Sequence, residues 1–342
     1  MGALIPADSH AVPEDEESRW FRVEEPAGVI PVRRAATALA ESVALPAASI
    51  AKLAIVVAEM SSNLVKHAVE GTLALRAIRQ CGQVGIEAIA VDRGPGMSDL
   101  ALSGLDGYST AGTLGIGLGA IARQSTWCQT YSQPGRGTVL AVQVWPDEAP
   151  GWWARGIERP MTGEQQCGDG YAVRTFDGRS QVLVSDGLGH GPLAHLASRT
   201  AIAAFHAAGP VGPAGVVEHL HRALVRTRGA AVLVVEIEPG GAVLRAAGLG
   251  NVAGSVVVGD NRRGVTSLPG IAGHQRRGVR EYTLDFPPGA RFVAHSDGVS
   301  DRWSPTDYPG LFERDPVVVA ATILRDAGTR RDDASVLVAV AP

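Results

Sequence analysis

The sequence predicts an α/β protein of two domains, and three observations support this prediction. A chain of 342 residues with 45% hydrophobic and 19% charged residues is globular in composition, and it exceeds the roughly 100 to 200 residues of one domain. Helical and strand periods alternate from Trp20 to Trp145, and strand-like runs dominate after residue 160. Between them, proline, glycine and mixed charge replace periodic apolar residues at 146–160. We therefore expect an acidic disordered tail at 1–19, a first domain at 20–146, a linker at 147–160 and a second domain at 161–342.

The periodicities place helices and strands along both domains. In the first domain we expect helices at 33–43, at 49–67 and from about 118, with strands at 73–80, 85–91, 126–132 and 138–145. In the second domain we expect strands at 181–185, 231–237, 242–246, 255–258, 291–295 and 335–340, with helices at 193–208, 213–228 and 316–326. The first set indicates an α/β sandwich. The second indicates a two-sheet sandwich flanked by helices.

The charge balance argues against nucleic-acid binding as the main role. The chain holds 31 Lys and Arg against 35 Asp and Glu, a net charge of −4, and so has no basic field for a polyanion. Seven of the acidic groups lie within the first 26 residues against two arginines, a local balance of −5. We expect that stretch to be a solvated tail.

Cysteine usage and hydropathy indicate a cytoplasmic protein off the membrane. Cys81, Cys128 and Cys167 are odd in number, far apart and without a CxxC motif, so neither a disulfide framework nor a zinc site is expected. The uncharged window 246–259 is shorter than the roughly 20 apolar residues of a membrane span. The N-terminus has no secretory signal pattern.

The predicted helix 49–67 carries a polar face that suits a nucleotide. Glu59, Asn63 and Lys66 follow one another at spacings of four and three, opposite the apolar residues of the same helix. A carboxylate, an amide and an ammonium group therefore point in one direction. An ordinary amphipathic helix with a solvated face explains the same pattern.

Two glycine-containing segments follow this helix. DRGPG (92–96) comes directly after the strand 85–91, where glycines allow a tight turn against a ligand and Asp92 offers an acceptor. GTLGIGLG (112–119) leads into a helix, whose free N–H groups suit phosphates. Each segment alone is also explained by a turn. The second is neither a Walker A loop, since no GK[ST] follows, nor a Rossmann loop, since a helix precedes it.

In this order the segments resemble the GHKL nucleotide-binding superfamily, and within it the RsbT-like serine kinases of the anti-sigma-factor type. The resemblance covers about residues 20–145 and rests on EMSSNLVKHA (59–68), DRGPGM (92–97), DGYST (106–110), GIGLG (115–119) and GRGT (135–138). It implies a Bergerat α/β sandwich that binds ATP and Mg²⁺. The short lid segment, and the lack of a histidine phospho-acceptor domain, favour phosphate transfer to a partner protein over autophosphorylation.

The resemblance also implies roles for single residues. Glu59 would be the general base toward an acceptor hydroxyl, and Asn63 would hold Mg²⁺ against the phosphates. Asp92 would receive the adenine amino group, with Thr138 in support. The glycines expected to shape the pocket are Gly94, Gly96, Gly115, Gly117 and Gly119. These roles agree with phosphoryl transfer, which depends on positioning and charge stabilisation rather than covalent work by the protein.

Acidic residues stand at several predicted strand ends of the second domain. Asp186-Gly187 and Asp297-Gly298 each follow an apolar strand, and Asp332-Asp333 precedes the last one. Asp169 lies before the first of these pairs. Carboxylates without a Cys or His cluster favour oxygen-preferring cations such as Mg²⁺ or Mn²⁺. A structural turn explains any single Asp-Gly pair.

Taken together, these segments resemble the PPM-type (type 2C) metal-dependent serine/threonine phosphatases, in the branch of the sporulation stage II protein E and RsbX-like members. The resemblance covers about residues 158–341 and rests on CGDGY (167–171), VSDGLGHG (184–191), GLGNV (248–252), SDGVSD (296–301) and RDDAS (331–335). It implies an α-β-β-α sandwich with two metal ions. The arginine that holds substrate phosphate in larger eukaryotic members has no counterpart that can be placed in this sequence.

By this resemblance Asp186 would bridge the two metals, and the carbonyl of Gly187 would bind one of them. Asp297 and Asp332 would bind the other, and Asp169 would join directly or through water. A water acidified by the two cations would attack phosphorus in line, which makes Asp186 and Asp297 catalytic. His190 either aids the leaving group or serves its glycine loop.

The two resemblances imply a bifunctional bacterial switch protein, a serine/threonine kinase joined to an opposing phosphatase. The implied substrate is a Ser or Thr on a STAS-domain partner, an anti-sigma antagonist or stressosome-type protein, in stress or sigma-factor signalling. The alternative is a phosphatase whose first domain senses nucleotide and binds a partner without phosphotransfer. Glu59 favours the first interpretation, because a pure binding module does not need it. The partner's identity, the signal, the choice of Mg²⁺ or Mn²⁺ and the oligomeric state stay open.

Overall fold

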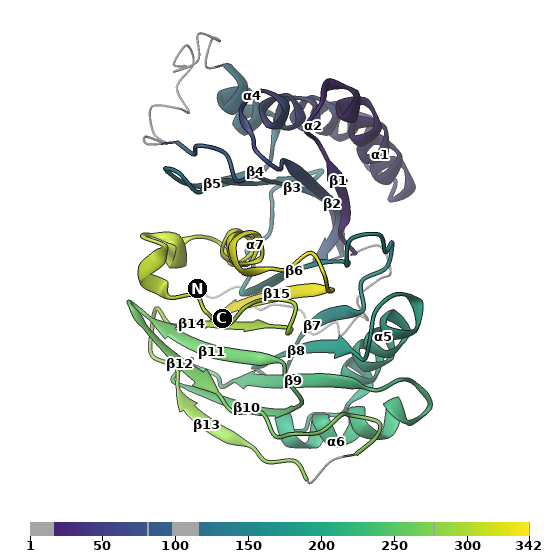
Figure 1. Cartoon of the computed structure of the whole chain (residues 1–342), viewed down its shortest axis with the longest axis vertical. Coiled ribbons are helices and arrows are strands. Elements are labelled where there is room, and N and C mark those ends of the chain that lie inside the picture. The colour runs from purple at the N-terminus through teal and green to yellow at the C-terminus, as the bar shows by residue number, and fades with distance from the viewer. Residues whose placement is uncertain (1–16, 81, 98–115, 276–277, 342) are drawn as a thin grey trace. The chain divides into compact units, whose positions relative to one another are not determined.

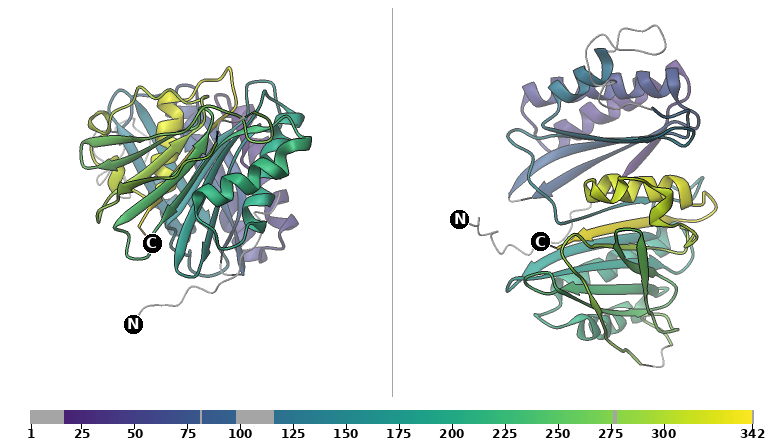
Figure 2. Two further views of the ribbon diagram at one scale, coloured as in Figure 1. Left: turned by 90° about the horizontal axis from the view of Figure 1, so that it is seen from below. Right: turned by 90° about the vertical axis from the view of Figure 1, so that its left-hand side faces the viewer.

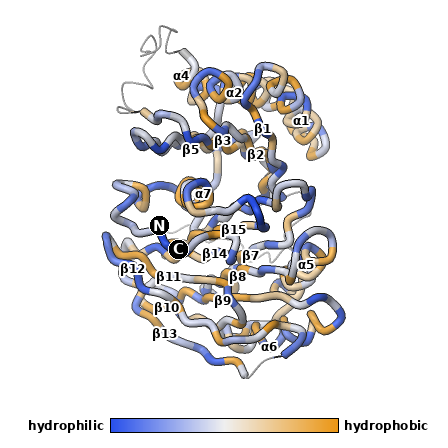
Figure 3. Tube along the Cα trace, in the orientation of Figure 1, coloured by the Kyte–Doolittle hydropathy of each residue, from blue (hydrophilic) through white to orange (hydrophobic). Residues whose placement is uncertain are grey.

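The computed structural model describes residues 17–80, 82–97, 116–275 and 278–341, and the description below is confined to them. The chain divides into two compact units, the first ending at Gly151 and the second starting at Trp152 (Figure 1). Each unit is described by itself. Apolar residues recur along α1 and α2, whereas hydrophilic residues dominate several connecting loops (Figure 3).

The first unit is a five-stranded antiparallel sheet with helices α1, α2 and α4 on one face (Figure 1). The strand order is β1-β2-β3-β5-β4. The strands are β1 (Arg19–Arg22), β2 (Thr72–Gln80), β3 (Gln83–Val91), β4 (Trp127–Gln133) and β5 (Gly137–Val144), and the helices are α1 (Val29–Ser42), α2 (Ala47–His67) and α4 (Ile116–Gln124), with the 3-10 turn η2 (Pro26–Gly28) before α1. This confirms the predicted α/β sandwich.

Helix α2 supplies much of the core of this unit. Its apolar stripe buries Leu53, Val57 and Met60 against the alternating inward residues of β2 and β3, such as Leu75 and Ile86. By length and composition, α2 is the one helix among the described residues long and apolar enough to cross a bilayer. Its apolar stripe is instead part of the protein core. Lys52 and Glu59 interrupt the uncharged stretch of this helix, so a search for uncharged windows does not reveal it.

The second unit is a four-layer α-β-β-α sandwich, as predicted (Figures 1 and 2). One sheet has the order β13-β10-β9-β8-β7 and the other β12-β11-β14-β15-β6, with antiparallel pairs throughout. Helices α5 and α6 cover the first sheet, and α7 covers the second. Aliphatic side chains fill the space between the sheets and the space beneath α5 and α6.

The elements of this unit have the following bounds. The strands are β6 (Ala154–Arg159), β7 (Asp169–Phe176), β8 (Arg179–Gly187), β9 (Ala230–Ile237), β10 (Val243–Leu249), β11 (Ala253–Val258), β12 (Asn261–Val265), β13 (Tyr282–Asp285), β14 (Arg291–His295) and β15 (Ala334–Val340). The helices are α5 (Pro192–Ala207), α6 (Pro213–Ala223) and α7 (Pro316–Ala327), with 3-10 turns η3 (Leu224–Arg226), η4 (Pro305–Asp307) and η5 (Leu311–Glu313).

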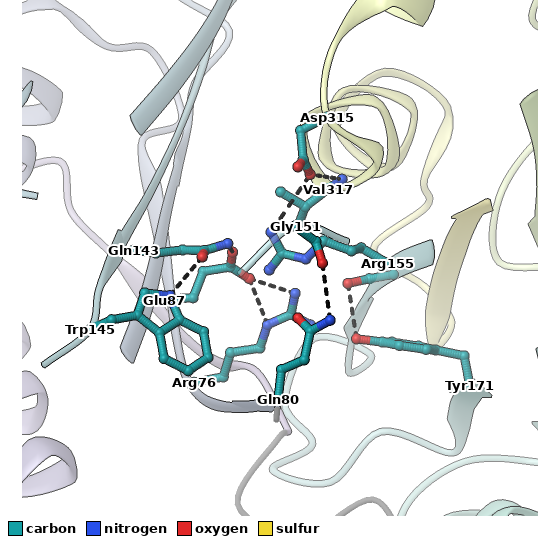
Figure 4. A network of polar contacts seen from close by, with 11 residues as sticks. Arg76, Gln80, Glu87, Gln143, Trp145, Gly151, Arg155, Tyr171, Asp315 and Val317 are labelled. Carbon is teal, nitrogen blue, oxygen red and sulfur yellow. Dashed lines mark hydrogen bonds and ion pairs between the residues drawn. The ribbon is translucent and has the colours of Figure 1, made fainter. Parts of the chain in front are cut away.

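Strand β6 lies inside the segment predicted to be a linker, 147–160. It pairs with β15, far along the chain, in a register that sets Ala154 opposite Ala339. Arg155 is buried 3.6 Å from Asp315, and the Tyr171 hydroxyl donates to the carbonyl of Gly156 at 3.0 Å (Figure 4). The second unit therefore begins before residue 161. The composition of its first strand, β6, resembles that of a loop, since it lacks a local apolar pattern. The segment is a buried strand because it pairs with the distant strand β15.

Other strands were also absent from the sequence prediction. Strand β1 is only four residues long, β12 is mostly exposed, and β7 starts at the motif residue Asp169. Helix α6 ends at Ala223, where the predicted helix continued to residue 228. The chain there tightens into η3 before turning into β9.

The first unit encloses a buried ion pair within its sheet. Glu87 accepts from Nε and Nη2 of Arg76 at 2.8 and 2.5 Å, and from Nε2 of Gln143 at 3.1 Å (Figure 4). Gln143 in turn accepts from the Trp145 indole at 2.8 Å. Arg76, Glu87 and Gln143 are cross-strand neighbours on β2, β3 and β5. The carboxylate of Glu87 is thus compensated by donors on both adjacent strands, as a buried charge requires.

The second unit buries an arginine that binds the end of α5. Arg174 on β7 donates to Gln181 at 3.0 and 2.6 Å and to the carbonyl of Phe205 at 2.6 Å. Beside it, both ring nitrogens of His206 are buried without a hydrogen-bond partner among the described residues. Burial, together with the guanidinium groups of Arg174 and Arg199, lowers the pKa of His206 to about 4.

We predict that His206 makes the second unit less stable in mild acid. Its folded-state pKa lies below the ordinary value of 6.5, so the unfolded chain binds the extra proton. The contribution of neutral His206 to the free energy of unfolding therefore has its full value above pH 6.5 and is lost as the pH falls toward 4. The total change is at most about 3 kcal/mol. Urea unfolding at pH 7.5 and pH 4.5 measures the difference.

The variant His206→Phe should show a smaller loss of unfolding free energy between these two pH values than the wild type. His219→Gln, on the neighbouring helix α6, is the matched control. An identical pH dependence in the wild type and His206→Phe would contradict the prediction.

Candidate functional sites

Helix α2 brings two predicted residues of the first unit together. Glu59 and Asn63 are four residues apart and share one face of the helix. A Cβ atom at Gly117, in the first turn of α4, would lie 3.4 Å from Oδ1 of Asn63 and 3.5 Å from Oε2 of Glu59. The missing side chain at Gly117 therefore leaves room in front of both polar groups. Lys66 is exposed at the end of the same helix.

The Asp92 turn is fixed by its own backbone and by the β4–β5 hairpin. Gly94 N donates to Oδ1 of Asp92 at 2.7 Å, and Asp92 N donates to the carbonyl of Thr138 at 3.0 Å. The hydroxyls of Thr138 and Ser132 lie 2.9 Å apart. Gly96 has a φ of +68° and packs against the hairpin backbone, where a side chain would clash. Asp92 is thereby held at the end of β3.

The predicted nucleotide residues thus form two groups. One is Glu59, Asn63 and Gly117, and the other is the Asp92 turn with Thr138. Gly119 is buried in α4. Gly115 and the lid segment 106–110 lie outside the described residues. The carboxylate and amide oxygens on α2 fit Mg²⁺, and the absence of a side chain at Gly117 leaves room in front of them.

In the second unit the strand register brings carboxylates together. Asp169 on β7 is the direct cross-strand neighbour of Asp186 on β8. Burial first, and then the charge of Asp186, raises the pKa of Asp169 well above its usual range. Its Oδ2 atom is buried without a well-formed hydrogen bond among the described residues, although the hydroxyls of Ser296 and Ser335 partly offset the rise. A buried, poorly compensated carboxylate of this kind is suited to binding a cation.

Asp186 and Asp297 meet at the ends of β8 and β14. Burial, followed by the charges of Asp297, Asp332 and Asp333, raises the pKa of Asp186 to about 7. Burial and Asp332 raise the pKa of Asp297 as well, and Asn251 donates to Oδ2 of Asp297 at 2.6 Å.

The carboxyl groups of Asp186 and Asp297 lie close enough for each to shift the pKa of the other. Asp332 is half-buried at the start of β15. The predicted set Asp169, Asp186, Asp297 and Asp332 therefore gathers at one end of the sandwich.

Asp333 has a different environment from the adjacent Asp332. Its two oxygens accept from Met161 N and Gly168 N, each at 2.8 Å. Burial nevertheless raises its pKa. Asp333 thus holds the segment that leads into Asp169.

Helix α5 supports the same segment from the other side. His195 Nδ1 lies 3.0 Å from the Cys167 carbonyl, and the Ser198 hydroxyl donates to the Gly168 carbonyl at 2.5 Å. Gly187 N also donates to Gly168 O, at 3.0 Å, and Gly187 lies so close to the backbone of α5 that any side chain would clash. The last residue of β8 is therefore required to be glycine.

His190 is exposed in this loop and pairs with Glu164 at 2.9 Å. Glu164 and Asn251 were not assigned roles from the sequence. Asn251 stands within the GLGNV motif, and Glu164 carries no sequence signal that would identify it.

The donors of this cluster suit divalent cations of the Mg²⁺ and Mn²⁺ class, because all of them are oxygens. Within the described ranges, no three His, Cys, Asp or Glu side chains already have the spacing of a metal centre. The buried Asp169 oxygen without a hydrogen-bond partner among the described residues, and the raised pKa of the neighbouring Asp186 and Asp297, both mark positions where a cation would compensate charge. The residues present therefore fit such a group.

Comparison with known proteins assigns each unit to a family. The histidine kinase-like ATPase domain family matches residues 23–144, and the stage II sporulation protein E family matches residues 177–341. The serine/threonine-protein kinase RsbT of Bacillus subtilis is 30% identical over 95 residues, which are 28% of this chain and 71% of that protein.

Solved structures are similar in fold. A chain from a study of "the bacterial stressosome: a modular system that has been adapted to control secondary messenger signaling" is 27% identical, with a TM-score of 0.50 over 54% of this chain and 97% of that chain. The PP2C phosphatase domain of SpoIIE from Bacillus subtilis, with a fragment of its regulatory domain, is 15% identical, with a TM-score of 0.46 over 77% of this chain and 81% of that chain.

We predict that Asp186→Asn stabilises the metal-free protein and weakens its response to Mn²⁺. Because the pKa of Asp186 is raised to about 7, the ionised carboxylate destabilises the folded state, and this cost is complete above pH 7. Removing the charge should raise the free energy of unfolding at pH 8 by on the order of 2 kcal/mol in EDTA. Mn²⁺ should raise the Tm of the wild type and have a much smaller effect on the variant.

The matched control is Asp177→Asn, at the exposed turn of the same β7–β8 hairpin. It should leave the Mn²⁺ response unchanged. Equal Mn²⁺-induced shifts in the wild type and Asp186→Asn would show that Asp186 does not bind the metal.

Proposed function

Since the chain belongs to the histidine kinase-like ATPase family in its first unit and to the stage II sporulation protein E family in its second, we propose that it is a bifunctional switch protein. The first unit phosphorylates a serine or threonine of a partner protein with ATP, and the second removes that phosphate. The observation that supports the proposal is that each unit has a cluster of polar side chains of the kind that its proposed reaction requires. Glu59 stands beside Asn63 and Gly117 in one unit, and the Asp186 cluster lies at strand ends in the other.

In the kinase reaction, Glu59 accepts the proton of the partner's hydroxyl as that oxygen attacks the γ-phosphorus. Mg²⁺, when bound, neutralises charge on the phosphate oxygens, and Asn63 would hold it. Asp92 accepts from the adenine amino group, with Thr138 in support. Gly94, Gly96, Gly115, Gly117 and Gly119 shape the pocket for the nucleotide.

In the phosphatase reaction, Asp169, Asp186, Asp297, Asp332 and the carbonyl of Gly187 would hold two Mn²⁺ or Mg²⁺ ions. When bound, these ions supply an acidified water and neutralise the phosphoryl oxygens. The task of the chain is to hold its carboxylates together against their mutual repulsion. Asn251 orients Asp297, and Asp333 holds the segment before Asp169 through two backbone amides.

The partner we propose is a STAS-domain protein, an anti-sigma antagonist or a stressosome-type scaffold, in cytoplasmic stress signalling. The 30% sequence identity to RsbT supports this proposal, as does the similarity to a structure from a study of the bacterial stressosome. The alternative is that the first unit binds nucleotide and the partner without transferring phosphate. That arrangement avoids the ATP consumption of two opposed activities on one chain.

We predict that Glu59→Gln abolishes phosphate transfer while ATP still binds. The assay uses the Asp186→Asn background, so that the product survives, with Mg-ATP and STAS-domain proteins from the same genome. Intact mass should show one added phosphate on the partner with Asp186→Asn. The additional Glu59→Gln substitution should slow this transfer at least about a hundredfold, because a positioned base contributes that much.

Glu41→Gln, an exposed carboxylate on α1, is the matched control and should transfer phosphate normally. Wild-type protein with Mn²⁺ should then remove the phosphate from the partner. Unmodified partners despite measured ATP binding would favour the nucleotide-sensing alternative.

A further inference from the structure

Arg228 is an exposed arginine in the turn that leads from η3 into β9. No hydrogen bond or ion pair joins its guanidinium group to any other residue in the described part of the chain. An arginine in solvent usually needs no explanation. The placement of Arg228, however, is fixed from both sides.

The backbone of the turn is held rigidly. The Thr227 hydroxyl accepts from Gly229 N at 3.0 Å and donates to the Leu224 carbonyl at 2.8 Å. Directly after the turn, Ala230 and Ala272 exchange two backbone hydrogen bonds, at 2.9 and 3.1 Å. Arg228 therefore projects from a preorganised loop, which lowers the entropic cost of using its side chain for binding.

The same turn lies against the loop that follows Asp186-Gly187. In the β8–β9 ladder, Asp186 is opposite Ala231 and Gly187 is opposite Ala230. The pairing continues beyond the strands, because Leu188 N donates to the Gly229 carbonyl at 3.0 Å. Arg228 thus extends the sheet at the end where the carboxylates gather.

The guanidinium group lies directly over this loop. A Cβ atom at Gly189 would be only 2.9 Å from Nη1 of Arg228. Gly189 also has a φ of +91°, so the position favours glycine for conformational reasons as well. The backbone conformation therefore favours glycine at position 189, and the absence of a side chain there leaves the space above the loop to the Arg228 guanidinium group.

We propose that Arg228 binds the phosphoryl group of the phosphorylated substrate in the second unit. This inference rests on the proposed phosphatase function. A phosphate ester is dianionic and approaches a cluster of carboxylates, so a fixed positive charge at the edge of that cluster favours its binding. The planar guanidinium offers paired donors to two phosphate oxygens, and no described residue occupies these donors.

The experiment compares Arg228→Gln and Arg228→Lys with the wild type, all loaded with Mn²⁺. Two quantities are measured: the Kd of inorganic phosphate by calorimetry, and kcat and KM for p-nitrophenyl phosphate. Arg228→Gln should raise the phosphate Kd and the KM about tenfold or more, since a charge-assisted contact is lost, with kcat changed less than about threefold. Arg228→Lys should recover part of the affinity. The Kd of Mn²⁺ should not change.

Arg226→Gln, an exposed arginine at the end of η3, is the matched control and should match the wild type. Phosphate Kd and KM values within twofold of the wild type in Arg228→Gln would overturn the inference. If Arg228→Gln does not fold, wild-type values in Arg228→Lys would overturn it, because lysine cannot reproduce paired donors. Failure of the wild type to hydrolyse p-nitrophenyl phosphate would instead contradict the proposed function, and the calorimetry would still test Arg228.

Discussion

The repulsion among carboxylates at one end of the second unit is the constraint on which its site depends. Hairpin register places Asp169 opposite Asp186, and the ends of β14 and β15 bring Asp297 toward Asp332. Among the described residues no ion pair with a basic side chain compensates Asp169, Asp186 or Asp297, and burial and mutual repulsion raise the pKa of Asp186 to about 7. The aliphatic core between the sheets offsets the cost of this arrangement. A divalent cation bound at this end of the sandwich would therefore offset the repulsion among the carboxylates.

Buried carboxylates have different surroundings in the two units, and these surroundings distinguish a structural carboxylate from a functional one. Glu87 in the first unit is fully buried, but Arg76 and Gln143 satisfy both of its oxygens. Asp169 in the second unit is also buried and has an oxygen without a well-formed partner. A satisfied carboxylate has a structural role, whereas an unsatisfied one is expected at a functional site. The site that we propose for the first unit instead uses Glu59 and Asn63, which are half-buried.

Patterns in the sequence predicted those features of the structure that depend on residues close together along the chain. The apolar stripe of α2 and the Asp-Gly pairs after β8 and β14 gave correct positions, because periodicity and turn chemistry act over a few residues. Strand β6 was missed because its burial comes from pairing with β15, nearly two hundred residues later. The contacts of Asn251 and Arg228 were equally invisible, since they follow from the register of distant strands. Tertiary pairing overrides composition at such places.

Asp332 and Asp333 show why a motif alone does not assign roles. Both belong to one RDDAS segment, yet the chain sends their side chains into different surroundings at the start of β15. Asp333 uses its two oxygens on the amides of Met161 and Gly168, and so fixes the backbone just before Asp169. The charge of Asp332 raises the pKa of both Asp186 and Asp297, whereas Asp333 has a smaller effect of the same sign on Asp186. Asp333 therefore positions the backbone, and Asp332 adds negative charge that a bound cation would neutralise.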